Sequence, residues 1–120
     1  DERGYIYIVD RKDDMIISGG ENIYPREVEE VIYRHPAILE AAVIGIPDPY
    51  WVERVHAVVV LRQGASLTAD ELITFSKKNL ASYKAPKSVE FLDSLPKTPS
   101  LKISRAELKK RYKISSEKPG

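Results

Sequence analysis

Lysine and arginine side chains gather in two zones of this 120-residue chain. Between Glu71 and Glu90 every charged residue is a lysine, and these stand at positions 77, 78, 84 and 87. From residue 97 to the end, eight Lys or Arg residues face only two Glu residues, although the net charge of the whole chain is +1. Cations concentrated in this way favour an anionic partner such as a nucleotide. The alternative is a solvated helix face and a charged tail, because most lysines in proteins are simply exposed.

Other kinds of catalytic motif are missing from the sequence. The chain has no cysteine, which excludes a disulfide, a thiolate metal site and a cysteine nucleophile. His35 and His56 lie far apart without clustered carboxylates, so we expect structural roles at a helix end and in a strand rather than a metal site. There is no GxxxxGK[ST] or GxGxxG phosphate loop, no GxSxG elbow and no RNA-binding aromatic signature. We therefore expect neither a bound metal nor a nucleic-acid partner.

Two adjacent glycines, Gly19 and Gly20, stand in the stretch "IISGGENIYP" at 16–25. They separate a predicted strand from a predicted helix, so we expect a tight turn in which one of them takes a positive φ. The alternative is that the backbone passes close to a ligand here, where a side chain would be in the way.

The elements that position these residues alternate between strands and helices. Pro25 suits the first turn of a helix, and Thr68 followed by Glu71 predicts a capping box at the start of another. Two continuous runs rich in Val and Ile predict central strands of a sheet that is covered on both faces. Strands are predicted at 5–9, 15–18, 40–47, 54–62 and 88–92, and helices from 25 to about 35, from 69 to about 80, and at 103–112.

This order predicts an α+β fold, with a small central β-sheet packed with helices plus an N-terminal β-hairpin. The length suits one domain, and no apolar run is long enough to span a membrane. Without a signal peptide or a cysteine, we expect a cytoplasmic protein. The chain opens inside a predicted strand without an initiator methionine, which suggests a piece of a longer polypeptide. We expect residues 1–115 to form the domain and 116–120 a disordered tail.

Three stretches of the sequence resemble the C-terminal domain of adenylate-forming (AMP-binding) enzymes. They are "GYIYIVDRKDDMIISGGENIYPREVEEVI", "EAAVIGIPDPYWVERVHAVVVLR" and "YKAPKSVEFLDSLPKTPSLKISRAELKK", and together they cover nearly the whole chain. The variant "DDMIISGGENIYPREVE" is most similar to the acyl-CoA synthetase branch, which includes fatty-acid and aryl-acid CoA ligases.

The resemblance implies a two-step reaction of the full-length enzyme. A carboxylate attacks the α-phosphate of Mg-ATP to give an acyl-adenylate and pyrophosphate, and the thiol of coenzyme A then displaces AMP. ATP and Mg²⁺ would be bound mainly by the enzyme's own N-terminal domain, which also holds the acid pocket. The small C-terminal domain would act as a lid that turns a different face to each half-reaction, and alone it would be inactive.

The resemblance also implies roles for single residues. Lys102 matches the family's catalytic lysine, although Leu101 stands where the family usually has glycine. Within residues 1–13, a strand and hinge segment, Asp13 matches the hinge and Arg11 a nucleotide-binding arginine. The positions that would bind coenzyme A or its pantetheine arm are Gly19, Gly20, Tyr83, Lys84 and Lys87. The alternative for each residue is an ordinary turn or a solvated charge.

Two other functions remain open from the sequence. One is an adenylation domain that delivers its acyl group to a carrier-protein thiol rather than to coenzyme A. The other is a non-enzymatic nucleotide- or RNA-binding module that uses the two basic zones, and salt-dependent binding to oligonucleotides would support it.

Overall fold

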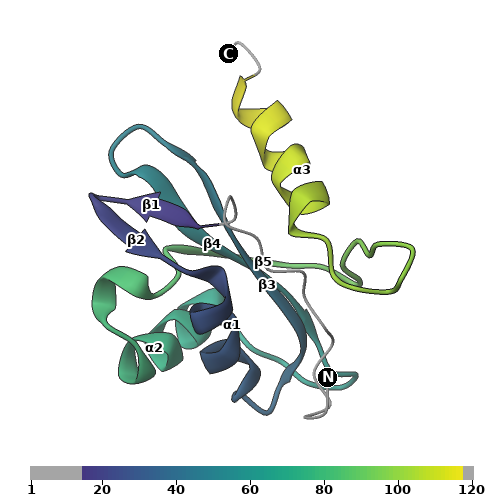
Figure 1. Cartoon of the computed structure of the whole chain (residues 1–120). Helices are drawn as coiled ribbons and strands as arrows, with labels where there is room; N and C mark the ends of the chain where they lie inside the picture. The colour runs from purple at the N-terminus through teal and green to yellow at the C-terminus, as the bar shows by residue number, and fades with distance from the viewer. Residues whose placement is uncertain (1–14, 118–120) are drawn as a thin grey trace.

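The computed structural model describes residues 15–117, and side chains as far as residue 111 (Figure 1). The predicted strand at 5–9, Arg11 and the hinge residue Asp13 lie outside the described residues. In chain order the elements are β1 (Ile16–Ser18), β2 (Glu21–Ile23), α1 (Pro25–Tyr33), β3 (Ile38–Asp48), β4 (Val52–Leu61), α2 (Ala69–Asn79), the 3₁₀ helix η2 (Ser82–Lys84), β5 (Ser88–Phe91) and α3 (Arg105–Glu117).

The predicted α+β class is confirmed. The predicted hairpin of 5–9 with 15–18 lies partly outside the described residues, and the structure shows a further hairpin after it. Ser18 pairs with Glu21 across a two-residue loop, so Gly19 and Gly20 close a hairpin between β1 and β2. Their φ angles are +58° and +85°, and positive φ at both central residues is what a tight type I′ hairpin turn requires. The sequence does not indicate a strand at 21–23, because this segment is short and its first two residues are polar.

The sheet is built around the long antiparallel pair of β3 and β4. β5 runs parallel to β4, and β1 joins β4 through the single pair Ser18 and Val52. The predicted strands at 40–47 and 54–62 leave a loop of six residues between them, which is longer than the observed turn. Pairing extends to Asp48 and Val52, which leaves a turn of three residues. Asp48 makes this possible, because its Oδ1 accepts the backbone N–H groups of Tyr50 and Trp51 at 2.8 and 3.0 Å.

Helices cover both faces of this sheet, as the two apolar runs predicted (Figure 1). Side chains of β4 alternate between the faces: Val55, Ala57 and Val59 pack toward α1 and α2, whereas Val58 and Val60 pack toward α3. The capping box of α2 is confirmed, with Thr68 and Glu71 exchanging hydrogen bonds of 2.8 and 3.1 Å. In the part of the chain that the structure describes, no helix has the length and apolar character needed to cross a bilayer.

Side chains from α1 occupy hydrogen-bonding positions along the outer edge of β3. The Tyr33 hydroxyl accepts the N–H of Ala41 at 3.0 Å and donates to its carbonyl at 3.3 Å. One carboxylate oxygen of Glu29 accepts the N–H of Val43 at 2.8 Å. These contacts satisfy backbone groups that a sheet edge would otherwise leave open.

Glu29 also forms a buried ion pair with Arg105, the first residue of α3. The guanidinium donates two hydrogen bonds to the carboxylate, at 2.7 and 2.9 Å. The side chains of Arg105 and Glu29 are 1% and 2% exposed. A bidentate pair fixes both distance and orientation, so this contact joins α1, the β3 edge and the start of α3.

Replacing Glu29 with Ala is expected to lower the free energy of unfolding by about 3–5 kcal/mol, because Arg105 would remain buried without its partner. Urea denaturation measures the loss. Glu107→Ala is the matched control, since its pair with Lys110 is exposed and contributes less than about 1 kcal/mol. Equal losses in the two variants would contradict the role of the buried pair.

Candidate functional site

The predicted catalytic residue, Lys102, lies on a compact loop between β5 and α3. Backbone hydrogen bonds close the loop at its base, where Ser104 N–H donates to the Pro96 carbonyl at 2.9 Å. At the tip, Thr98 N–H donates to the Lys102 carbonyl at 2.7 Å, and the Thr98 hydroxyl accepts the Lys102 N–H at 3.2 Å. Lys102 itself is half-buried. The backbone that carries it is therefore held in place by the loop's own hydrogen bonds.

Apolar and charged contacts anchor this loop to the α3 face of the sheet. Leu95 and Ile103 are buried in the core on that face. The Lys97 ammonium lies 3.1 Å from the carboxylate of Glu40 on β3 and donates to the Leu95 carbonyl at 3.3 Å. Lys97 belongs to the basic zone noted in the sequence, yet its contacts are those of a structural residue.

Leu101 immediately before the lysine has a φ of +67°. For an L-residue with a Cβ, this left-handed conformation costs roughly 1–2 kcal/mol. The side chain is 75% exposed, so burial offsets little of that cost. The backbone therefore has the conformation that glycine adopts most readily, which gives a physical reason for the glycine that the family resemblance leads one to expect here.

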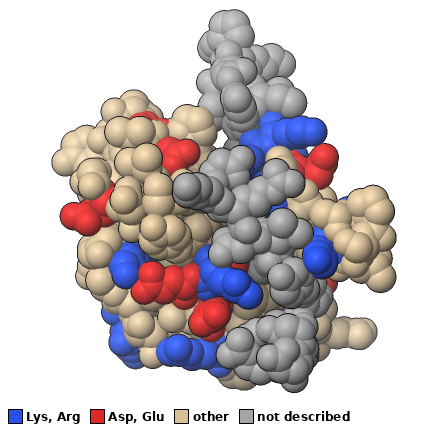
Figure 2. All heavy atoms as spheres, viewed as in Figure 1, with Lys and Arg blue, Asp and Glu red and all other residues tan. Residues whose placement is uncertain are grey.

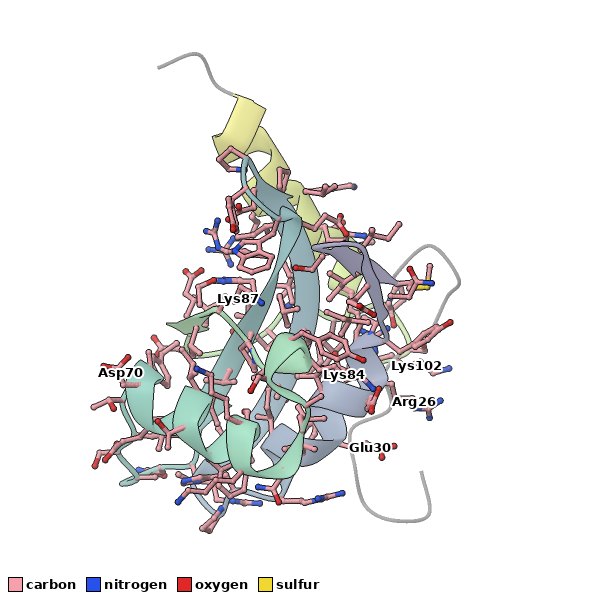
Figure 3. The ribbon with its side chains drawn as sticks, turned by 90° about the vertical axis from the view of Figure 1, so that its left-hand side faces the viewer. Arg26, Glu30, Asp70, Lys84, Lys87 and Lys102 are labelled. Atoms are coloured by element: carbon pink, nitrogen blue, oxygen red, sulfur yellow. The ribbon has the colours of Figure 1, made fainter. Side chains whose placement is uncertain are left out.

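A separate hollow of about 540 Å³ opens between α2, η2 and the β3–β4 turn. Tyr83 and Lys87, two of the predicted coenzyme A residues, line it. The complete lining is Trp51, Ile73, Lys77, Ser82, Tyr83, Ala85, Pro86 and Lys87. In Figure 3, Lys87 and Lys102 lie well apart on the ribbon.

Trp51 connects the glycine turn to this hollow. Gly19 N–H donates to the Trp51 carbonyl at 2.8 Å, and a Cβ on Gly19 would lie 2.9 Å from a carbon of the indole ring. The Lys87 ammonium lies 4.5 Å from the centroid of the Trp51 ring, within the range of a cation–π contact. The structure thus brings Gly19 and Lys87 against the Trp51 ring, and Tyr83 lines the same hollow as Trp51.

Two ammonium groups make the hollow electropositive. Burial lowers the pKa of Lys87, and the nearby Lys77 ammonium lowers it further. Such a pair attracts an anion, because a bound negative charge relieves the mutual repulsion.

Lys84 is directed elsewhere. Its ammonium lies 2.9 Å from the Glu27 carboxylate on α1, and this hydrogen bond raises the pKa of Lys84. It does not line the hollow. On the face drawn in Figure 2, basic and acidic side chains are interspersed rather than gathered into one basic surface.

Gly20 differs from its neighbour in its surroundings. A Cβ there would meet no atom within 4 Å. Close packing inside the domain therefore does not require glycine at this position. Its φ of +85° and the space in front of the turn are what a side chain would disturb.

Comparison with known proteins identifies the family of this chain. Residues 27–102 match the family model of the AMP-binding enzyme C-terminal domain. The chain belongs to this family.

Similar proteins of this family include two curated relatives and one solved structure. A feruloyl-CoA synthase from Amycolatopsis sp is 53% identical over 112 residues, which cover 93% of this chain and 23% of that protein. A long-chain-fatty-acid–CoA ligase from Bacillus subtilis (strain 168) is 55% identical over 108 residues, covering 90% and 19%. The structure of a Mycobacterium tuberculosis fatty acyl CoA synthetase superposes with a TM-score of 0.82 at 43% identity, covering 96% and 23%. The chain therefore spans less than a quarter of each of these relatives.

Both histidines of this AMP-binding C-terminal domain make contacts within the fold. His56 is buried in β4, its Nδ1 lies 2.6 Å from the Ser88 hydroxyl, and burial lowers its pKa. His35 accepts the N–H of Ala37 and packs edge-on against Phe75. Among the described residues, no group of three or more His, Asp or Glu side chains is arranged to hold a metal ion.

Trp51 is a candidate site residue that the sequence did not indicate. The only tryptophan of the chain stands in the segment "PDPYWVE", which predicted nothing more than a loop. A lone tryptophan next to a tight turn was the available signal. Its contact with the glycine turn depends on strand pairing between β1 and β4, which periodicity does not reveal.

Replacing Leu101 with Gly is expected to raise the free energy of unfolding by about 0.5–1 kcal/mol. The variant relieves left-handed strain, and the greater freedom of glycine in the unfolded chain offsets part of that gain. Urea denaturation measures the change. Leu101→Ala is the control, because it shortens the side chain but keeps the strain. A gain of the same size in both variants would contradict this explanation.

Proposed function

We propose that this domain is the lid of an AMP-forming acid–CoA ligase, which converts a carboxylic acid, ATP and coenzyme A to an acyl-CoA, AMP and pyrophosphate. One observation carries the proposal: the domain holds two sets of candidate residues in different places. The Lys102 loop packs on the α3 face, and the hollow beside Trp51 opens next to α2. A lid that turns one place and then the other toward a shared active site would serve two half-reactions.

In the first half-reaction, Lys102 supplies positive charge. As the acid's carboxylate bonds to the α-phosphorus and pyrophosphate leaves, negative charge grows on the phosphate oxygens. An ammonium held close to them stabilises the transition state more than the ground state. The closed loop around Lys102 supports this role, since less backbone freedom is lost when the lysine enters the site.

In the second half-reaction, the thiol of coenzyme A attacks the acyl carbon and AMP leaves. Lys77 and Lys87 give the hollow the charge to bind the phosphates of coenzyme A. The rings of Tyr83 and Trp51 offer apolar faces for its adenine. Gly19 and Gly20 would line the path of the pantetheine arm.

The remaining components belong to the full-length protein. ATP with its Mg²⁺ and the acid would be held mainly by an N-terminal domain of the same enzyme, and Arg11 and Asp13 would serve nucleotide binding and the hinge. We further propose a cytoplasmic location, which the absence of cysteine supports. The two curated relatives are named for different acids, so the acid would be chosen by the N-terminal domain.

Replacing Lys102 with Ala in the full-length enzyme is expected to lower the rate of adenylate formation by roughly 10²–10³-fold, the effect of removing one preorganised charge from a transition state. Acid-dependent exchange of pyrophosphate into ATP measures this step. Lys110→Ala is the control, because Lys110 is exposed on α3. Adenylation at the wild-type rate in Lys102→Ala would disprove the catalytic assignment.

Replacing Gly20 with Leu in the full-length enzyme is expected to slow thioester formation at least tenfold more than adenylation, because the new side chain obstructs the pantetheine path. Single-turnover transfer from preformed acyl-adenylate to coenzyme A separates the steps. Gly64→Leu is a matched control: Gly64 also has a positive φ, +81°, with no atom within 4 Å of a Cβ. If Gly20→Leu slows both half-reactions equally, Gly19 and Gly20 serve only as a turn and do not line the pantetheine path.

The thiol acceptor is tested in the same assay. The two lysines of the hollow favour coenzyme A, because its nucleotide phosphates are anions that a carrier-protein pantetheine arm lacks. Transfer to a carrier protein without transfer to coenzyme A would replace the ligase proposal with the carrier-protein alternative.

A further inference from the structure

Hairpin β1–β2 is attached to the rest of the sheet by few backbone contacts. β1 pairs with β4 only at Ser18 and Val52, and Gly19 N–H reaches the Trp51 carbonyl at the turn. Two residues earlier on the same side of the strand, Ile17 N–H donates instead to the side chain of Glu53, at 2.9 Å from Oε1. A carboxylate oxygen thus takes the place of a ladder carbonyl and extends the attachment by one hydrogen bond.

The Glu53 carboxyl group lies over Gly45 of β3. A Cβ on Gly45 would come within 2.9 Å of Glu53 Oε1 and 3.0 Å of its carboxyl carbon. It would also lie 3.0 Å from a methyl carbon of Ile16. At these distances the Glu53 carboxyl group would have to shift, so it can lie in its present position because residue 45 has no side chain.

Glu53 on β4 thus binds β1 through a hydrogen bond, and Gly45 on β3 leaves the space for its carboxyl group. Val52, between Trp51 and Glu53, has a φ of +77° and is 67% exposed. A β-branched residue in this conformation is strained, which shows that the turn and the start of β4 are constrained by their surroundings. Ile17 N–H and Gly19 N–H mark the two ends of this constrained contact between β1 and β4.

We propose that Glu53 is a positioning residue, which holds the Gly19-Gly20 turn against Trp51, one of the residues that line the hollow. Gly45 also contributes to this positioning, since it provides the space for the Glu53 carboxyl group. The functional part of this inference rests on the proposed ligase activity, because thioester formation is the step that would use the turn. The structural part stands without it.

The first test is hydrogen exchange, followed by mass spectrometry, on the protein that carries this domain. In Glu53→Ala, peptides that span 15–22 are expected to exchange about 3- to 10-fold faster than in the wild type, as the loss of one hydrogen bond implies. Glu53→Gln keeps an oxygen acceptor and is expected to restore most of the protection. Glu30→Ala, the same change on the exposed surface of α1 (Figure 3), is the control. The proposal is overturned if these peptides exchange in Glu53→Ala at the wild-type rate, or if they exchange in Glu53→Gln as fast as in Glu53→Ala.

The second test separates positioning from general stability. Glu53→Ala is expected to slow acyl transfer to coenzyme A about 3- to 10-fold, in proportion to the loss of protection, and to change adenylation less than about twofold. Gly45→Ala displaces the same carboxyl group and is expected to give the same pattern. The variant that combines Glu53→Ala with Gly45→Ala should raise the activation free energy of acyl transfer by less than the sum of the two single effects, because both changes disrupt one contact. Equal losses in the two half-reactions, or additive losses, overturn the positioning role.

Failure of the ligase proposal gives a different result. A wild-type protein that forms no thioester on coenzyme A disproves the proposed activity. The exchange measurements on Glu53→Ala, Glu53→Gln and Gly45→Ala still decide whether the contact holds the turn.

Discussion

The buried ion pair between Glu29 and Arg105 is the interaction on which most of this architecture depends. An isolated buried charge is very unfavourable, so the two helices that carry these residues can settle only where the charges meet. Glu29 also binds Val43 N–H, which fixes the height of the pair along β3. Arg105 begins α3 three positions after Lys102, and the loop with the candidate catalytic lysine is therefore oriented from inside the core. Apolar packing alone would hold α3 to the sheet without fixing its position along the strands so closely.

Backbone strain marks the surfaces that we connect with function. Val52 and Leu101 are the non-glycine residues with positive φ among those described, and neither is in the apolar core. One adjoins Trp51 and the glycine turn, and the other adjoins Lys102. Strained backbone persists only where its surroundings hold it, and here hydrogen bonds of Asp48 and Thr98 provide that support. The strain thus lies within the two segments whose geometry the proposed reaction would need.

Much of the fold could be predicted from local patterns in the sequence. The Val and Ile runs indicated the covered strands β3 and β4, and the Thr68 capping box fixed the start of α2. The hairpin β1–β2 was not predicted, because its second strand has only three residues, which are mostly exposed. The candidate site could be predicted only in part from the sequence. A family resemblance indicated Lys102, Tyr83 and Lys87. The roles of Trp51, Glu53 and the Glu29–Arg105 pair depend on contacts between distant segments, which local patterns do not reveal. α3 also continues to Glu117, beyond the predicted helix end at residue 112.

The closed edge of β3 has a consequence for a domain that changes partners. The proposed lid would alternate between two poses and uncover surfaces in every catalytic cycle, and an open strand edge on such a surface would be a template for another chain. Tyr33 and Glu29 occupy hydrogen-bonding positions along this edge with side chains of the domain itself. The edge therefore resists adding a foreign strand at Ala41 and Val43 in either pose. In a crowded cell, the repeated opening of the proposed lid would thus carry less risk of self-association along this strand.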